Sequence, residues 1–138
     1  MTKLTFLKLG GSLITDKTRP YTPRLDKLAE LAAQIASATR LDPDLRLVLG
    51  HGSGSFGHAA ASQHWPVNTD WTRADWRVFA EVWYQASALN RLVVDALHNA
   101  GIAAIGFPPS ATCRADSSAI VDWYLPTLQR ALEVGTHP

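Results

Sequence analysis

Apolar positions in this chain form short continuous runs that alternate with longer stretches of helical spacing. Two runs that end at glycine, Leu4–Leu9 and Arg46–Gly50, predict buried strands. Between them, leucine, isoleucine and alanine recur every three or four residues from Arg24 to about Thr39, which predicts an amphipathic helix. The polar, proline-containing stretch Ile14–Pro23 is typical of an exposed loop.

A second, longer helix is predicted in the other half of the chain. Thr72 and Asp75 have the spacing of a capping box, and helical periodicity then continues for about seven turns to a stop at Gly101. The remaining predicted elements are strands at Ile102–Phe107 and Ala119–Trp123 and a last helix near Pro126–Val134. Strands that alternate with helices predict an α/β fold, a mainly parallel sheet with helices on both faces.

Composition narrows the possible functions. The 138 residues, 46% of them hydrophobic, suit one globular domain. Thirteen basic and twelve acidic residues are dispersed, so no nucleic-acid partner is expected. The single Cys113 excludes an internal disulfide and a cysteine-rich zinc site. No apolar run approaches the ~18 residues of a membrane span, and Lys3 and Lys8 interrupt the apolar start, so a cytoplasmic protein without a signal peptide is expected.

The candidate chemistry lies where the first two predicted strands end. Gly10-Gly11-Ser12 follows the first strand, and the segment His51–His58 (HGSGSFGH) follows the second. In parallel sheets, ligands bind beyond the carboxyl ends of the strands. Glycine lets the backbone approach an anion closely, and amides at a helix start favour negative charge. The two loops therefore predict one shared phosphate site, with His51 at the strand end expected to brace its loop.

Other phosphate-binding motifs explain these loops less well. Gly52, Gly54 and Gly57 match the dinucleotide pattern G-x-G-x-x-G, which leaves an NAD-binding domain as an alternative. That motif needs an acidic residue at the end of the next strand, whereas Asp70 lies in a connection with no strand before it. The chain has neither the G-K-[ST] of a Walker A loop nor the G-x-S-x-G of a hydrolase.

The run Lys8–Ser12 with Lys17 downstream, together with His51–His58, resembles the amino acid kinase superfamily and, within it, the isopentenyl phosphate kinases. The Phe-Gly-His ending of the second loop is typical of these kinases and of the kinase that phosphorylates fosfomycin. The resemblance extends over essentially the whole chain. It implies that residues 1–138 form a single substrate-binding lobe, the amino-terminal lobe of an αβα sandwich, and that the carboxy-terminal nucleotide-binding lobe is absent. Ser53 departs from the family pattern, which has glycine or alanine there.

The resemblance also implies roles for individual residues. The implied catalytic residues are Lys8, which reaches the transferring phosphoryl group, Lys17, which closes from its loop, and His58, which donates a hydrogen bond to the substrate phosphate. The ATP phosphates would be cradled by Lys8, Gly10, Gly11, Ser12 and Gly54, and the substrate would be held by Gly52, Ser53, Gly54 and His58. Independently, a lysine inside an apolar strand costs desolvation unless an anion compensates it. A lone histidine is more often structural than functional.

An aromatic stripe on the long helix adds a possible substrate contact. Trp76, Phe79 and Trp83 share one helix face, and core packing is the commoner interpretation of such a stripe. An isoprenoid tail, however, needs an apolar pocket near the phosphate, so Phe79, Val82 and Trp83 are also predicted to line that pocket.

The resemblance thus implies a kinase that transfers a phosphoryl group from ATP with Mg²⁺ to isopentenyl phosphate, incomplete as a 138-residue chain. Two alternatives stay open. One is a non-catalytic, truncated module that binds a phosphate ligand, and the other is a superfamily kinase that phosphorylates fosfomycin or an amino acid. No tightly bound cofactor or metal site is expected. An open sheet edge predicts a homo-oligomer. The resemblance implies that this oligomer is a homodimer.

Overall fold

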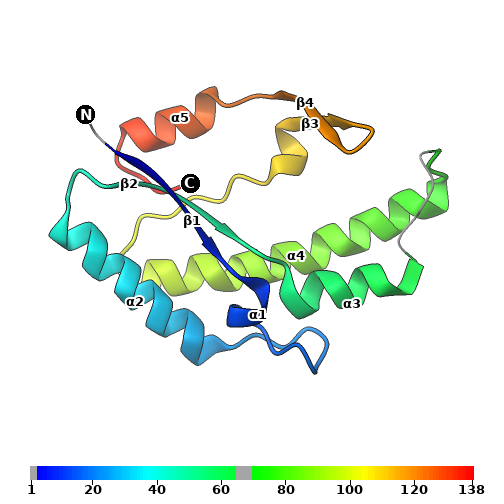
Figure 1. The fold of residues 1–138 in the computed structure, drawn as a ribbon, viewed down its shortest axis with the longest axis horizontal. Helices are drawn as coiled ribbons and strands as arrows, with labels where there is room; N and C mark the ends of the chain where they lie inside the picture. Colours follow the sequence, from blue (N-terminus) through cyan, green and yellow to red (C-terminus); the bar gives the residue numbers. More distant parts are fainter. Residues whose placement is uncertain (1–2, 65–69) are drawn as a thin grey trace.

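The computed structural model describes residues 3–64 and 70–138 and has the predicted α/β architecture (Figure 1). Its elements, in chain order, are β1 (Leu4–Leu9), α1 (Gly11–Ile14), α2 (Leu25–Leu41), β2 (Arg46–His51), α3 (Gly54–His64), α4 (Arg73–Asn99), the 3₁₀ turn η1 (Pro109–Ala111), β3 (Cys113–Asp116), β4 (Ala119–Trp123) and α5 (Pro126–Glu133).

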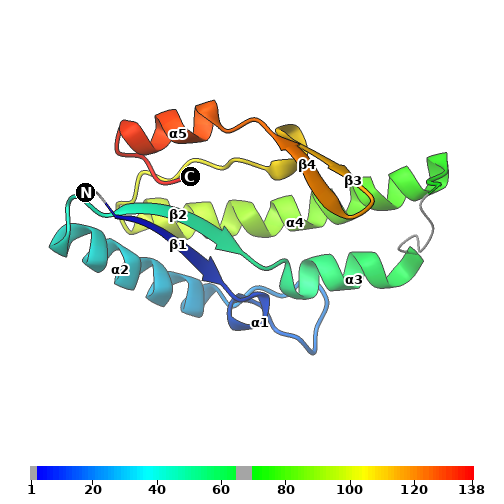
Figure 2. The ribbon, with the colours of Figure 1, turned by 45° about the horizontal axis from the view of Figure 1, so that its top comes forward.

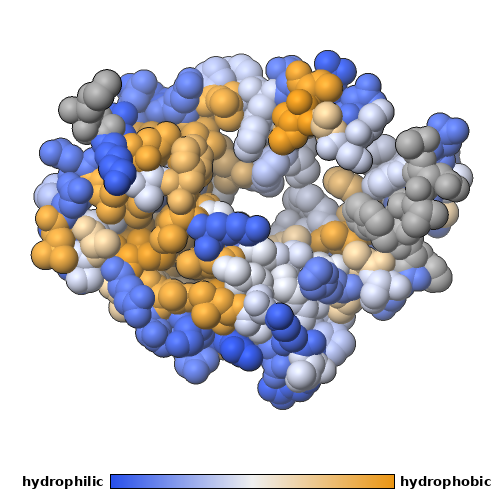
Figure 3. Space-filling view, in the orientation of Figure 1, coloured by the Kyte–Doolittle hydropathy of each residue, from blue (hydrophilic) through white to orange (hydrophobic). Residues whose placement is uncertain are grey.

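The two strands that carry the glycine loops are neighbours. β1 and β2 pair in parallel, in a register that runs from Leu4 opposite Arg46 to Leu9 opposite His51. Both strands therefore end at the same edge of the sheet, which brings the two loops together as the sequence predicts. Along β1, Leu9 is buried, whereas Phe6 on the opposite face is 74% exposed. Apolar side chains are accordingly visible over the strands in the space-filling view (Figure 3).

The core lies between this strand pair and the helices α2 and α4. The helices contribute residues one turn apart, and the buried positions are Leu28, Ala32, Ile35 and Ala36 from α2 and Leu89, Val93 and Leu97 from α4. These side chains pack in one cluster with Leu9 and Leu47 of the strands. The strands lie between α2 and α5 in both ribbon views (Figures 1 and 2). The core thus fixes the two strand ends relative to the long helix.

The start and end of α4 match the sequence signals. The Thr72 hydroxyl accepts a hydrogen bond from the Asp75 amide, and the Asp75 carboxylate accepts one from the Thr72 amide, which completes the capping box. At the other end, Gly101 adopts a φ of +85°, a conformation that favours glycine. No helix of the described residues is both long enough and apolar enough to span a membrane.

Three parts of the fold differ from the sequence prediction. The segment 102–107 is not a regular strand: within the described residues it forms a single bridge, from Ala104 to His137. β4 pairs antiparallel with β3 in a separate hairpin and does not join the parallel sheet. The helix α3 and the short helix α1 were predicted only as loops.

Residues 136–138 take a position beside β2. The Leu49 amide donates to the Pro138 carbonyl at 2.7 Å, and the Ile105 amide donates to the His137 carbonyl at 3.0 Å. The carboxy-terminal residues thus lie between β2 and the segment around Ala104.

Candidate functional site

The two glycine loops are in backbone contact. A Cβ atom on Gly11 would lie 2.5 Å from the Gly54 nitrogen, and one on Gly52 would lie 2.7 Å from the Gly11 nitrogen. Because backbone atoms cannot move aside as a flexible side chain can, only glycine fits at these positions. Gly54 also has a φ of +50°, where other residues are strained. This contact makes the two loops one structural unit.

A buried threonine joins the same loops. The side chain of Thr15 is inaccessible to solvent, and its hydroxyl donates to the Gly11 carbonyl at 2.6 Å and accepts from the Ser55 amide at 3.0 Å. The Ser55 hydroxyl in turn accepts from the Thr22 amide at 3.3 Å. Thr15 and Ser55 could not be identified from the sequence, because a single threonine or serine in a polar loop gives no periodic signal.

Several loop amides are available to a ligand. Counting only acceptors within the described residues, the amides of Gly10, Gly11, Ser12, Ser53 and Gly54 have no hydrogen-bond partner. The last two stand at the start of α3, where the helix dipole adds a partial positive charge. Backbone amides of glycine-rich loops and helix starts bind phosphate groups. The candidate site is therefore an anion-binding edge formed by both loops.

The amide of Gly52, unlike those of the neighbouring loop residues, already has a hydrogen-bond partner. It donates to the Leu9 carbonyl at 2.9 Å, which continues the pairing between the two strands. The contribution of Gly52 to the site is therefore the missing side chain, which permits the close approach of Gly11, while its amide is already occupied.

His51 braces the second loop, as its position at the strand end predicts. Its Nδ1 atom lies 3.1 Å from the Gly52 carbonyl oxygen, and its Nε2 atom lies 3.0 Å from the side-chain nitrogen of Asn90. Asn90 is in the middle of α4, so this pair connects the long helix to the loop. The sequence analysis gave Asn90 no role, because nothing near position 90 indicates which loop the helix faces.

The predicted catalytic side chains all lie on exposed positions. Lys8 is near the end of β1, on the same face as Phe6, Lys17 is in the loop before α2, and His58 follows Gly54 by about one turn of α3. The exposure of Lys8 corrects one argument from the sequence: the lysine does not incur the desolvation cost expected inside a buried strand. The roles of these three residues stay predictions.

The loop that carries Lys17 is held by an acidic residue. The Asp16 carboxylate accepts hydrogen bonds from the amide and hydroxyl of Thr18, at 2.8 and 2.7 Å, and from Arg19 Nε at 3.0 Å. The bonds from Thr18, with a further contribution from Arg19, lower the pKa of Asp16 from 3.8 to about 2. The turn at the Lys17 loop is thus built around an ionised carboxylate.

We expect the Asp16 carboxyl to titrate with a midpoint of about 2 in a carbon-13 NMR pH series. The folded-state pKa lies below the unfolded-state value, so the carboxylate stabilises the folded chain fully above about pH 4, and this contribution is lost as the pH falls towards 2. Either Thr18→Ala or Arg19→Ala should raise the midpoint, whereas Lys27→Ala, in α2, should leave it in place. A wild-type midpoint at the ordinary 3.8 would contradict the described turn.

The residues predicted to line an isoprenoid pocket have different surroundings. Phe79 packs against Trp71 and Trp76, with ring centroids 6.1 and 5.5 Å away. Trp83, 45% exposed, donates from its indole nitrogen to the Ser110 hydroxyl at 2.9 Å. Val82 between them is half-buried. Their role towards a substrate stays a prediction.

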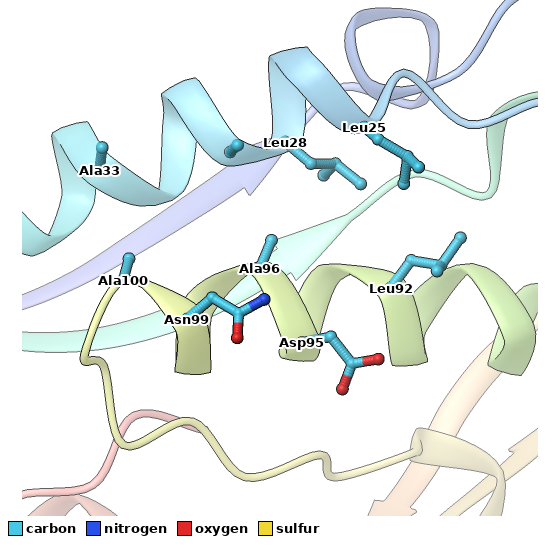
Figure 4. A pocket seen from close by; sticks show the side chains of 9 residues that line it. Leu25, Leu28, Ala33, Leu92, Asp95, Ala96, Asn99 and Ala100 are labelled. Atoms are coloured by element: carbon cyan, nitrogen blue, oxygen red, sulfur yellow. The ribbon is translucent and has the colours of Figure 1, made fainter.

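An apolar groove of about 430 Å³ lies elsewhere, between α2 and α4 (Figure 4). Leucine and alanine side chains from both helices line it, including Leu28, Ala33, Leu92 and Ala96. None of its lining residues belongs to a glycine loop, so the groove is no part of the candidate phosphate site. Within residues 3–64 and 70–138, no cluster of three or more histidine, cysteine, aspartate or glutamate residues could hold a metal ion.

The chain is similar in sequence to curated isopentenyl phosphate kinases. The isopentenyl phosphate kinase of Methanothermobacter thermautotrophicus is 34% identical over 141 residues, covering 98% of this chain and 51% of that protein. The isopentenyl phosphate kinase of Haloferax volcanii is 34% identical over 135 residues, covering 98% of this chain and 53% of that protein. The one of Methanocaldococcus jannaschii is 32% identical over 114 residues, covering 78% of this chain and 44% of that protein. The chain thus spans about half the length of these relatives.

Solved structures and a family model agree with this relationship. An isopentenyl phosphate kinase crystal structure superimposes with a TM-score of 0.86 at 33% identity, covering 99% of this chain and 56% of the other. The crystal structure of a T. acidophilum isopentenyl phosphate kinase product complex gives a TM-score of 0.81 at 27% identity, covering 99% of this chain and 53% of the other. The model of the amino acid kinase family matches residues 3–138. With this match over nearly its whole length, the chain belongs to the amino acid kinase family.

Proposed function

We propose that this chain carries the phosphate-binding part of an isopentenyl phosphate kinase and acts as its substrate-binding lobe. The observation that carries the proposal is the set of unpartnered amides at Gly11, Ser12, Ser53 and Gly54 on two loops in backbone contact. Amides fixed in this way suit a reaction that brings two phosphate groups together. The names of the curated relatives supply the substrate class.

In the proposed reaction, a phosphate oxygen of isopentenyl phosphate attacks the γ-phosphorus of ATP. A new oxygen–phosphorus bond forms, the bond from the γ-phosphorus to the β–γ bridging oxygen breaks, and isopentenyl diphosphate and ADP result. Phosphoryl transfer needs mainly alignment and neutralisation of negative charge. Gly10, Gly11 and Ser12 would hold the ATP phosphates, and Ser53 and Gly54 the acceptor. Mg²⁺ would enter with ATP as part of the substrate complex.

Three cationic or hydrogen-bonding side chains complete this proposal. The ammonium group of Lys8 would neutralise charge on the moving phosphoryl group, and Lys17 would approach from the loop held by Asp16. His58 would donate a hydrogen bond to the acceptor phosphate. All three lie on exposed positions around the loops, where a bound anion could meet them.

A phosphorus NMR time course of the chain with isopentenyl phosphate and MgATP tests the proposal. We expect growth of diphosphate and ADP resonances. A shift of the monoester resonance without turnover would instead favour the non-catalytic module described next. Lys8→Met should weaken either effect, whereas Lys3→Met, which changes an exposed lysine just before β1, should not. If neither turnover nor a shift occurs, the proposal is wrong.

A second candidate is a module that binds a phosphate compound without transferring a phosphoryl group. It is favoured by one observation: the unpartnered amides of the two loops account for binding of a phosphate group and for no further step. Under this alternative the monoester resonance shifts but no ADP forms, and ATP binds weakly. The same NMR experiment with fosfomycin or an amino acid in place of isopentenyl phosphate tests the other kinases of the superfamily as alternatives. A shift or turnover with one of those compounds, and none with isopentenyl phosphate, would reassign the substrate.

We also propose that the chain forms a homodimer. Within the described part of the chain β1 pairs only with β2, so the other edge of β1 carries unpaired backbone groups beside the exposed Phe6. Light scattering coupled to gel filtration should give twice the monomer mass. A monomer at micromolar concentration would refute this proposal.

A further inference from the structure

We infer that Asn90 is a positioning residue for the phosphate loop and acts through His51 on the peptide unit between Gly52 and Ser53. The inference rests on the proposed function in one respect: it takes the Ser53 amide to be a ligand of the bound phosphate. The contacts that carry it are those of His51 with Gly52 and Asn90.

The partners of His51 fix which ring nitrogen holds the proton. The Gly52 carbonyl oxygen can only accept a hydrogen bond, so His51 Nδ1, 3.1 Å away, must be the donor. In a neutral imidazole Nε2 is then an acceptor, and the Asn90 side-chain amide donates to it at 3.0 Å. Asn90 therefore selects the form of His51 that can hold the carbonyl.

Holding this carbonyl also orients an amide. The Gly52 carbonyl and the Ser53 N–H belong to one planar trans peptide unit and point in opposite directions. With the carbonyl turned to His51, the Ser53 N–H points away from the imidazole, and it has no partner within the described residues. Rotation of this unit would instead present a carbonyl oxygen to a bound anion, which repels it.

The glycine at position 52 makes such a brace necessary. A glycine backbone has access to more conformations than any other residue, so its peptide units are costly to fix. On the other side of Gly52, the amide is already held by the Leu9 carbonyl. The contact with His51 fixes the peptide unit on the other side of Gly52, and Asn90 connects His51 to α4. Near Asn90 on this helix, Leu89 and Val93 are buried in the core.

Nitrogen-15 NMR of histidine-labelled chain tests the pairing directly. At alkaline pH we expect the wild-type His51 ring to be protonated at Nδ1, and we expect Asn90→Leu to shift the ring towards the Nε2-protonated form. Asn99→Leu, which alters an exposed asparagine of the same helix, should leave the spectrum unchanged. A wild-type ring protonated at Nε2 would overturn the inference.

Affinity for isopentenyl phosphate tests the consequence for the site. Loss of one hydrogen bond predicts binding weakened about three- to tenfold in both His51→Leu and Asn90→Leu. His51→Asn should recover part of this loss, because its amide nitrogen can take the place of Nδ1, and a purely structural role would not produce that recovery. Asn99→Leu should bind like wild type.

The outcomes separate this inference from the proposed function. If wild type binds isopentenyl phosphate and His51→Leu binds it equally well while remaining folded, the positioning role is wrong and the proposed function stands. If wild type binds no phosphate compound, the proposed function is wrong, and the predicted loss of affinity in the His51 and Asn90 variants is wrong as well. The ring-nitrogen spectrum then still supports or overturns the pairing of Asn90 with His51.

Discussion

Alanine in place of Gly11 is expected to weaken binding of isopentenyl phosphate about tenfold or more and to lower the free energy of unfolding by roughly 1 to 3 kcal/mol. The added Cβ would lie 2.5 Å from the Gly54 nitrogen and 2.7 Å from its Cα. Relief of this overlap requires the two loops to separate. Separation would move the amides of one loop away from those of the other, so that they no longer converge on one phosphate site.

Gly10→Ala is the matched control for this prediction. Gly10 is the neighbouring glycine of the same loop, but a Cβ there would meet nothing within 4 Å, and its φ of −62° suits any residue. We expect its unfolding free energy to change by less than about 0.5 kcal/mol. Calorimetry of both variants, with titration of isopentenyl phosphate, makes the comparison. Equal behaviour of the two variants would show that the loops are not in contact.

Leu89→Ala is expected to destabilise the chain by roughly 2 to 5 kcal/mol, a large part of the 5 to 15 kcal/mol of a typical domain. Leu89 is completely buried on α4, in the cluster that joins α2, α4 and both strands. Removal of its side chain leaves a cavity that the surrounding helices and strands fill only partly.

Leu41→Ala provides the comparison for Leu89. Leu41 ends α2 and is 84% exposed, so its truncation should change stability by less than about 0.5 kcal/mol. Urea unfolding followed by circular dichroism measures both variants. A loss below 1 kcal/mol for Leu89→Ala would mean that the core packs differently from the described one.

Much of the fold could be predicted because its signals are local. The apolar run of β1 ends at glycine, and the Thr72–Asp75 pair begins α4 through contacts within one turn. The meeting of the two loops also followed from the sequence, because parallel neighbouring strands end at the same edge. These predictions needed no knowledge of distant contacts.

The rest depends on contacts between residues far apart in the chain. Thr15 is recognisable as a brace only when Ser55 is known to lie against it, and Asn90 only when α4 is known to pass His51. The apolar run 102–107 predicted a regular strand, but a strand needs a partner along its length, and among the described residues this run has one bridge, from Ala104 to His137. Site residues held by such pairings leave no periodic pattern in the sequence.

The pairing of Leu49 with Pro138 has a consequence for the order of folding. It connects β2 to the last residues of the chain across α3, α4 and the β3–β4 hairpin. Such long-range pairing forms late, because the intervening chain must lose entropy before the contact forms. During synthesis, α2 and the β1–β2 pair can assemble while the outer edge of β2 stays open, and the sheet closes there only after residue 138 has left the ribosome. During refolding, the Leu49 amide should therefore become protected against hydrogen exchange later than the amides within α2.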